Sequence, residues 1–357
     1  MLAPYAERAR RHPDGIIDLS VGTPIDPVPD FVQRALADAA NAPGYPTTVG
    51  TAQVREACAG WLGRRLGVSC PSNGIIPSIG SKELVAWLPT LLGLGPEDHV
   101  VLPRIAYPTY AVGAVLGGCR FTATDEPESI EDASLIWINS PGNPTGRVLE
   151  APRLAEIVAH ARSIGALVAS DECYAELGWE ARPTSVLHRD ACAGSHDGLL
   201  ALHSLSKRSN LAGYRFGFVA GDPTVIANLL EVRKHAGMMT PSPVQAAAVA
   251  ALEDDLHVDQ QRERYRGRRA ILRTALESAG FAIDHSEAGL YLWATRGEPC
   301  WETVGWFAES GILVTPGDFY GPAGQRHVRV ALTASDLEVA DCARRLELAV
   351  GDDSPGA

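Results

Sequence analysis

A regular alternation of short apolar runs with amphipathic stretches constrains the fold of this chain more than any other feature. The apolar runs lie at residues 99–102, 135–138, 166–170, 199–203 and 215–220. Between them, the stretch 151–163 carries Leu154, Ile157, Val158 and Ala161 at the spacing of one helix face. Buried strands joined by crossover helices form a mainly parallel sheet. We therefore predict an α/β fold, in which ligands bind at the carboxyl ends of the strands.

The last third of the chain predicts a smaller α+β unit. A helical pattern runs from about residue 223 to 273 with a break near 237–243, and short strands are expected at 289–294, 312–315 and 327–332. A length of 357 residues favours about two domains. We expect a large domain over residues 41–245 and a small domain that combines residues 1–40 with 246–357.

Composition excludes several classes of function. The net charge of −12 gives no broad positive surface for nucleic acid or an anionic membrane. No apolar segment has the length of a signal peptide or a membrane span, so we expect a cytoplasmic protein. Seven cysteines without a Cys-x-x-Cys pair predict reduced, mostly buried thiols, and no two histidines stand four apart as a helical zinc site needs. The arginine-rich stretch 262–269 predicts a solvated helix face.

Lysine is scarce, which narrows the search for an amine nucleophile. Of 31 basic residues only Lys82, Lys207 and Lys234 are lysines. Lys207 stands in Ser204-Leu205-Ser206-Lys207, directly after a predicted strand, and Arg215 follows eight residues later. A strand-end amine can condense with an aldehyde, while hydroxyls and a guanidinium can hold a phosphate dianion. These residues outline a pocket for pyridoxal phosphate, although Ser-x-Ser-Lys alone is also typical of a surface loop.

Polar residues follow two further predicted strands. Asp171 ends the run 166–170, and a buried carboxylate at that place needs a cation, which a protonated pyridine nitrogen would supply. Tyr174 could then reach the phenolic oxygen of the same ring. Taken alone, Asp171 is explained about equally well as the N-cap of a helix. After the run 135–138, the turn Asn139 to Gly146 contains two prolines and two glycines, and its rigidity would aim the Asn143 amide at one acceptor.

A third signal lies at Gly80-Ser81-Lys82, where a glycine opens an apolar helical pattern. Free amides at a helix start bind anions, so this segment would hold the phosphate. Lys82 would thus serve the phosphate end of the pocket rather than the aldehyde. Lys234 lies in a helical stretch without such neighbours.

These segments, in this order, resemble the fold-type I pyridoxal phosphate enzymes, and specifically the aspartate aminotransferase superfamily. The resemblance runs from about Ile17 to Leu332 and rests on Asn-Pro-Thr-Gly, Asp-Glu-Cys-Tyr and Ser-Leu-Ser-Lys with the later arginine. It implies that Lys207 carries pyridoxal 5′-phosphate as a Schiff base and that Asp171 pairs with the ring nitrogen. Asn143 and Tyr174 would donate to the ring hydroxyl. The phosphate would be held by Ser204, Arg215, Gly80, Ser81 and Lys82.

Further positions follow from the same resemblance. Tyr107 matches the aromatic residue that stacks on the cofactor ring, with Tyr110 as a weaker candidate. Tyr45, together with Gly50, matches the segment that reaches the phosphate of a neighbouring subunit, which implies a homodimer with shared active sites. Gly22 and Arg329 match the clamp on the substrate α-carboxylate, for which a bidentate guanidinium is well suited.

The resemblance implies a ping-pong transamination between amino acids and keto acids. The opening segment His12 to Pro29, with Tyr45 to Gly50, looks like the N-succinyldiaminopimelate transaminases of actinobacteria. That likeness implies glutamate and 2-oxoglutarate as one pair and N-succinyl-L,L-2,6-diaminopimelate as the other amino acid, in lysine biosynthesis. Arg11, Arg104 and Arg208 are candidate ligands of a distal carboxylate.

Two other interpretations stay open at this point. An aspartate, alanine or aromatic aminotransferase, or a β-eliminating C–S lyase, would share the same ring pocket. A cofactor-sensing domain of a transcription regulator is less favoured, because it would need a DNA-binding module before residue 15.

Overall fold

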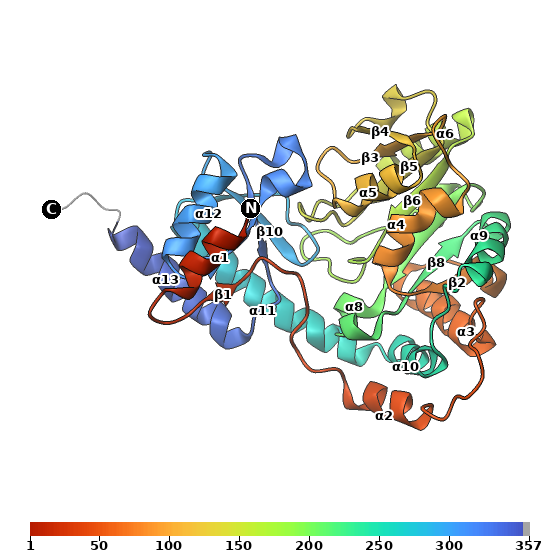
Figure 1. The fold of residues 1–357 in the computed structure, drawn as a ribbon, viewed down its shortest axis with the longest axis horizontal. Coiled ribbons are helices and arrows are strands. Elements are labelled where there is room, and N and C mark those ends of the chain that lie inside the picture. Colours follow the sequence, from red (N-terminus) through yellow and green to blue (C-terminus); the bar gives the residue numbers. More distant parts are fainter. Residues whose placement is uncertain (353–357) are drawn as a thin grey trace.

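A seven-stranded sheet forms the centre of the larger part of the molecule. The computed structural model describes residues 1–352 (Figure 1). Its strand order is β2-β8-β7-β6-β5-β3-β4, and β8 runs antiparallel to both of its neighbours while the other pairs are parallel. The strands are β2 (Ile75–Ser78), β3 (His99–Leu102), β4 (Arg120–Ala123), β5 (Leu135–Asn139), β6 (Leu167–Asp171), β7 (Leu199–Ser204) and β8 (Gly217–Gly221). The predicted α/β class is confirmed.

Each face of this sheet is covered by helices because its strands are apolar on both sides. On β5, Leu135 and Trp137 pack into one core while Ile136 and Ile138 pack into the other, as the two-residue period of a strand requires. The first core lies under α4 (Ser81–Leu91), α5 (Thr109–Leu116) and α9 (Pro223–His235). The second lies under α2 (Asp30–Asp38), α3 (Ala52–Trp61), α6 (Ala151–Ile164), α7 (Arg189–Cys192) and α10 (Ser242–Glu253).

The smaller part of the molecule has its own sheets and a third core (Figure 1). A four-stranded sheet has the order β12-β13-β10-β9, and β1 pairs in parallel with β11. Its elements are α1 (Ala3–Arg10), β1 (Ile17–Asp18), β9 (Ala282–Asp284), β10 (Tyr291–Thr295), α12 (Cys300–Glu309), β11 (Ile312–Leu313), β12 (Thr315–Pro316), β13 (Val328–Ala331) and α13 (Asp336–Asp352). The long helix α11 (Leu256–Ser278) leads into this part from the large one. Pairing of residue 17 with residue 312 brings the amino-terminal segment into it.

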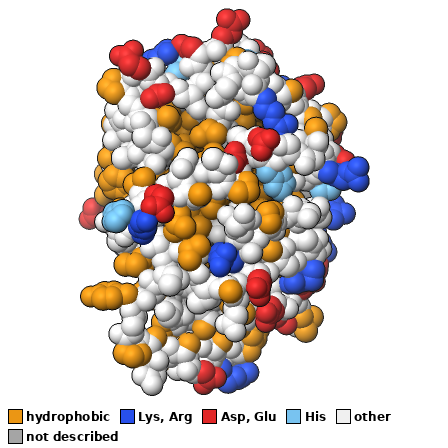
Figure 2. Space-filling view, turned by 90° about the vertical axis from the view of Figure 1, so that its right-hand side faces the viewer, with side chains coloured by type: hydrophobic (Ala, Val, Ile, Leu, Met, Phe, Trp, Pro, Cys, Tyr) orange, Lys and Arg blue, Asp and Glu red, His pale blue; other side chains and the backbone are white. Residues whose placement is uncertain are grey.

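The domain boundaries expected from the sequence stay a prediction. Helix α10, which crosses the expected boundary at residue 245, contributes Ala247, Ala248, Ala251 and Leu252 to the same core as α3. Figure 2 views the large-sheet side of the molecule and shows apolar side chains gathered in a band down the middle of that face. In the part of the chain that the structure describes, no helix is long and apolar enough to cross a bilayer.

Several local expectations were incomplete. Strands β1, β2, β4 and β9 were not predicted: β1 has only two residues, β2 contains Pro77, and β4 is an edge strand with mostly exposed side chains. The helical pattern 223–273 breaks a second time, at Asp254 and Asp255, and its last helix ends at Ser278. Six of the seven cysteines are buried, and Cys173 is half-buried.

The prediction of a solvated arginine face on α11 is wrong for Arg268 and Arg269. Both side chains are buried. Arg268 donates two hydrogen bonds of 2.8 and 2.7 Å to the Asp26 carboxylate, and Arg269 binds Glu180 through bonds of 2.9 and 2.8 Å. The amino-terminal segment and the loop after β6 cover this side of the helix, which no local charge pattern reveals.

Candidate active site

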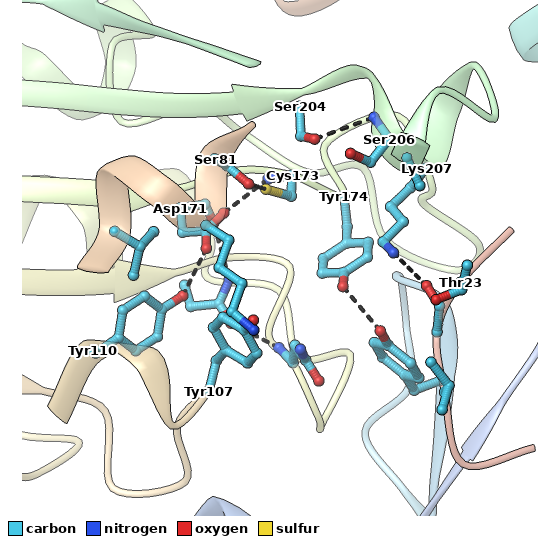
Figure 3. Close-up of a pocket in the computed structure, with 18 of the residues that line it drawn as sticks. Thr23, Ser81, Tyr107, Tyr110, Asp171, Cys173, Tyr174, Ser204, Ser206 and Lys207 are labelled. Carbon is cyan, nitrogen blue, oxygen red and sulfur yellow. Dashed lines mark hydrogen bonds between the residues drawn. The ribbon is translucent and has the colours of Figure 1, made fainter. Parts of the chain in front are cut away.

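A cavity of about 580 Å³ opens at the carboxyl ends of β5, β6 and β7, where the large sheet faces the small one. It brings together residues from eight segments of the chain (Figure 3). Of the residues singled out from the sequence, those that line it are Gly22, Ser81, Lys82, Tyr107, Tyr110, Asn143, Asp171, Tyr174, Ser204, Lys207, Arg215 and Arg329. Gly80 lies directly behind the lining. Tyr45 lies outside the cavity and is 95% exposed.

Lys207 projects into this cavity from α8 (Leu205–Arg208), a single helical turn that follows β7. The Ser204 hydroxyl caps this turn by accepting a 3.1 Å hydrogen bond from the Ser206 amide. The Lys207 ammonium donates to the Gly22 carbonyl oxygen. Burial lowers the pKa of Lys207 because it disfavours the charged amine. The site therefore holds an amine that reaches its neutral, nucleophilic form more easily than a surface lysine.

Asp171 ends β6 as a buried carboxylate on the opposite side of the cavity. It accepts a 2.9 Å hydrogen bond from the Tyr110 hydroxyl and a 3.3 Å bond from the Cys173 amide. Burial raises the pKa of Asp171, and these bonds only partly oppose that effect. No ion pair joins Asp171 to a side chain in residues 1–350. A cation arriving in the cavity would therefore relieve a carboxylate that is now poorly compensated.

Tyr110 has a different place from the one considered in the sequence analysis. It is fully buried, stacks on Trp137 with ring centroids 4.9 Å apart, and holds Asp171 through its hydroxyl. Tyr107 lines the cavity and is only half-buried, with the Lys82 ammonium 5.8 Å from its ring centroid. Tyr107 is thus the better placed of the two to lie against a planar ligand.

Donors for an anion gather at the end of the cavity formed by α4. Gly80 precedes α4 with φ at 74°, and a Cβ at that position would overlap the Arg215 guanidinium. The first amides of α4 are free of intrahelical partners. Ser81, Ser204 and Ser206 add hydroxyl groups nearby. A helix start, a guanidinium and hydroxyls around one space form a site for a phosphate dianion.

Arg329 lies at the other end of the cavity, on β13. Its Nη1 donates to the Asn143 side-chain oxygen at 3.0 Å and its Nη2 to the Ser20 carbonyl at 2.6 Å. Its buried Nε has no hydrogen-bond partner. The backbone of Asn143 is itself fixed, since its N–H donates a 2.7 Å hydrogen bond to the side-chain oxygen of Asn139. A firmly held guanidinium that lines the cavity fits an incoming carboxylate.

The structure also corrects one set of candidates. Arg208 does not line the cavity: it is buried, pairs with Glu176 and lies over the Trp61 ring at 5.5 Å. Arg11 and Arg104 are exposed and do not line it either. The three arginines proposed as distal-carboxylate ligands therefore have no place in this chain's own cavity.

Sequence reasoning missed several lining residues, above all Tyr291, Asn139 and Cys173. Tyr291 opens β10, and the only signal for it was its place at the start of the predicted strand 289–294. Asn139 lies in the quoted turn, where its side chain bridges to the Asp171 carbonyl at 3.0 Å. Cys173 was assigned to buried thiols, yet its sulfur lies 3.1 Å from the Ser81 hydroxyl.

Comparison with known proteins identifies this kind of site. The family model described as aminotransferase class I and II matches residues 14–346, almost the whole chain. The chain belongs to the class I and II aminotransferases.

Relatives support this assignment to the aminotransferases. A Streptomyces rimosus protein named 4-dedimethylamino-4-oxo-anhydrotetracycline transaminase OxyQ is 58% identical, over 97% of each chain. A probable aminotransferase of Mycobacterium tuberculosis is 60% identical over 97% of this chain and 83% of its own. A solved structure of a probable N-succinyldiaminopimelate aminotransferase from Thermus thermophilus covers 98% of this chain and 100% of its own, with a TM-score of 0.87 and 29% identity.

The family and fold are pyridoxal 5′-phosphate dependent, and the cavity of this aminotransferase fits that group. The anion site at α4 suits its phosphate, the poorly compensated Asp171 suits its ring nitrogen, and the amine of Lys207 suits its aldehyde. When bound, its protonated ring supplies an electron sink for the electrons released at the substrate Cα.

Proposed function

We propose that this aminotransferase moves the amino group between glutamate and the keto acid of N-succinyl-L,L-2,6-diaminopimelate, in lysine biosynthesis. The observation that carries the amino-acid part is Arg329, whose guanidinium lines the cavity and is held there by Asn143 and by the Ser20 carbonyl. That geometry suits an α-carboxylate. The diaminopimelate part is supported by the likeness to the Thermus protein, a probable N-succinyldiaminopimelate aminotransferase. LL-diaminopimelate aminotransferases such as that of Gloeobacter violaceus, 32% identical over 97% of this chain, also support it.

Each residue of the cavity then has a stated task. Arg329 and Asn143 orient the α-carboxylate, so that the substrate Cα faces the Lys207 side of the cavity. Lys207 would take the proton from the substrate Cα, for which its lowered pKa is suited. With the cofactor bound, Asp171 would hold the proton on the ring nitrogen. Tyr174 would donate its hydroxyl to the phenolic oxygen of the ring, and Tyr107 would pack against the ring.

The proposal includes a homodimer with shared sites. Tyr45 is 95% exposed, although a tyrosine ring usually finds cover. It lies in the segment that ends at Gly50, which matches the family segment reaching a neighbouring subunit's phosphate. The large-sheet side of the molecule also carries a band of apolar side chains that a second copy could cover (Figure 2). Two measurements test this. Sedimentation should show a dimer for both the wild-type holoenzyme and Tyr45→Ala, and titration of the apoenzyme with pyridoxal phosphate should show weaker binding only in the variant.

The Streptomyces rimosus relative favours a second candidate function. Its 58% identity over 97% of both chains greatly exceeds the 29% identity of the Thermus protein. Its name describes amino transfer to a ketone of an anhydrotetracycline. A polycyclic ketone has no α-carboxylate for Arg329, so in this case Arg329 would serve the amino donor alone. An aspartate, alanine or aromatic aminotransferase and a C–S lyase remain further alternatives.

A half-reaction screen tests these alternatives directly. The purified holoenzyme is mixed with one amino acid at a time, and the absorption spectrum of the bound cofactor is followed. Loss of the visible band with glutamate and N-succinyldiaminopimelate, but not with aspartate or alanine, is the expected result. Response to glutamate with no response to N-succinyldiaminopimelate would overturn the lysine-pathway proposal, and acceptor assays with anhydrotetracycline ketones would then follow. Release of pyruvate without a keto-acid partner would show a lyase.

A further inference from the structure

We propose that Tyr291 is a positioning residue of this active site that acts on two others at once. Its ring sets the plane of the Arg329 guanidinium, and its hydroxyl directs the proton of Tyr174 into the cavity. The inference rests on the proposed function in two respects, namely that Arg329 binds the substrate α-carboxylate and that Tyr174 donates to the phenolic oxygen of the cofactor. It does not depend on which amino acid is the second substrate.

Strand register places Tyr291 beside Arg329. In the antiparallel pair of β10 with β13, Tyr291 lies opposite Ala331 and Trp293 lies opposite Arg329. Tyr291 and Arg329 are therefore diagonal neighbours on the same face of the sheet, within reach for an aromatic and a long side chain. The guanidinium carbon lies 4.0 Å from the Tyr291 ring centroid. At this distance the cation is attracted to the ring face.

The ring contact completes the fixation of Arg329. Two nitrogen atoms are already held, one by Asn143 and one by the Ser20 carbonyl. Nη2 also makes a long contact of 3.5 Å to the Thr315 hydroxyl. These contacts hold the outer nitrogen atoms of the guanidinium, whereas the Tyr291 ring supports one of its flat faces and so sets the plane in which it meets the cavity. Tyr320 adds a weaker contact, with its centroid 5.2 Å away.

The hydroxyl of Tyr291 lies 3.1 Å from that of Tyr174, and both side chains are buried. In Figure 3 the dashed line that starts at the labelled Tyr174 hydroxyl marks this bond. Each phenol has one proton to give. If Tyr291 donates to the Tyr174 oxygen, the proton of Tyr174 is left for an acceptor in the cavity, and the first bond makes Tyr174 a stronger donor. Tyr174 is the one hydrogen-bond partner of the Tyr291 hydroxyl within residues 1–350.

Gly22 fits this arrangement without any special backbone angle. A Cβ on Gly22 would overlap the Tyr291 hydroxyl. The Gly22 carbonyl meanwhile accepts from the Lys207 ammonium. The amino-terminal segment thus passes close over Tyr291 only because residue 22 has no side chain. Through its hydrogen bond to Tyr174, Tyr291 also links β10 of the small sheet to the loop after β6 of the large one.

The test separates the ring from the hydroxyl. Tyr291→Phe keeps the ring and removes the hydroxyl, whereas Tyr291→Leu removes both. Tyr265→Phe is the matched control, because Tyr265 is a buried tyrosine of the same core that does not line the cavity. The readouts are the pH midpoint of the visible absorption change of bound pyridoxal phosphate, its dissociation constant, and KM against kcat for glutamate.

We expect Tyr291→Phe to raise the pH midpoint by less than Tyr174→Phe does, because a weaker donor stabilises the anionic ring oxygen less. Its KM for glutamate should stay within twofold of wild type. Tyr291→Leu should show the same pH midpoint as Tyr291→Phe. Its KM for glutamate should be raised by about 2- to 30-fold relative to wild type, which corresponds to the free energy of a cation–ring contact. Tyr265→Phe should change neither quantity.

Two results would overturn the inference. A midpoint in Tyr291→Phe equal to wild type, while Tyr174→Phe shifts it, would remove the role of the hydroxyl. Equal KM values for Tyr291→Phe and Tyr291→Leu would remove the role of the ring. Arg329→Lys separates this failure from that of the proposed function: if it leaves KM for glutamate unchanged, Arg329 is not the carboxylate ligand. Circular dichroism confirms folding, and Tyr291→Met replaces Tyr291→Leu should the latter not fold.

Discussion

Replacing Asp171 with asparagine should shift stability in opposite directions without and with the cofactor. The substitution keeps the shape of the side chain and removes its charge. An asparagine oxygen can still accept from the Cys173 amide, and its NH₂ group can donate to the Tyr110 oxygen. The change is therefore mainly electrostatic, and its one hydrogen-bonding cost is that the buried Tyr110 hydroxyl proton loses its acceptor.

Without the cofactor, the variant should be more stable at neutral pH. Burial raises the pKa of Asp171 above its unfolded value, so ionising this carboxyl destabilises the folded state. This destabilisation is present above the folded pKa and disappears below the unfolded pKa of 3.8. The advantage of the variant should shrink as the pH falls toward 4.

With the cofactor the sign should reverse. Removing one partner of a buried charge pair costs about 3–5 kcal/mol, which predicts cofactor binding weaker by roughly two to four orders of magnitude. The stabilisation that ligand binding adds to Tm falls accordingly. Differential scanning fluorimetry of apoenzyme and holoenzyme between pH 4 and 8 measures both effects.

A matched control is Glu176→Gln, which breaks a buried pair with Arg208 outside the cavity. It should lower Tm with and without cofactor alike. If Asp171→Asn also lowers both values equally, Asp171 has a structural role only and its pairing with a ring nitrogen is wrong.

Three further predictions test other parts of the structure. Lys207→Ala should abolish nearly all transamination and the visible cofactor band; a variant with normal turnover would refute its assignment. Gly80→Ala should weaken pyridoxal phosphate binding by about 5- to 30-fold, since it strains a residue at φ 74° and displaces Arg215. Fluorescence titration of the apoenzyme measures this affinity, and an unchanged value would contradict the prediction. Arg268→Ala should destabilise the protein by on the order of 3 kcal/mol in urea unfolding at pH 7. Although burial raises the pKa of Asp26, bonds from Arg268 and Gln261 outweigh it and hold the pKa low, so this deficit should shrink as acid protonates Asp26 and should not grow.

Local patterns in the sequence were sufficient for the large sheet and for the residues at its strand ends. Five of its seven strands are continuous apolar runs, because a strand covered on both faces has no polar side. Lys207, Asp171 and Asn143 each follow such a run within a few residues, so their convergence at one edge followed from parallel strand direction alone. The edge strand β4 and the proline-containing β2 lack that pattern and were missed.

Contacts between distant parts of the chain were decided only by the tertiary structure. From the sequence, Arg208 was a candidate ligand of a substrate carboxylate and Arg268 was part of a solvated helix face. In the structure each is buried against a carboxylate of this chain, Glu176 and Asp26 respectively. Tyr110 became the partner of Asp171 across 61 positions, and Tyr291 that of Tyr174 across 117. Periodicity reports which face of an element is buried and not what covers it. The sequence by itself therefore determined the fold class and the strand-end chemistry, while the packing of one sheet against the other decided which side chains complete the site.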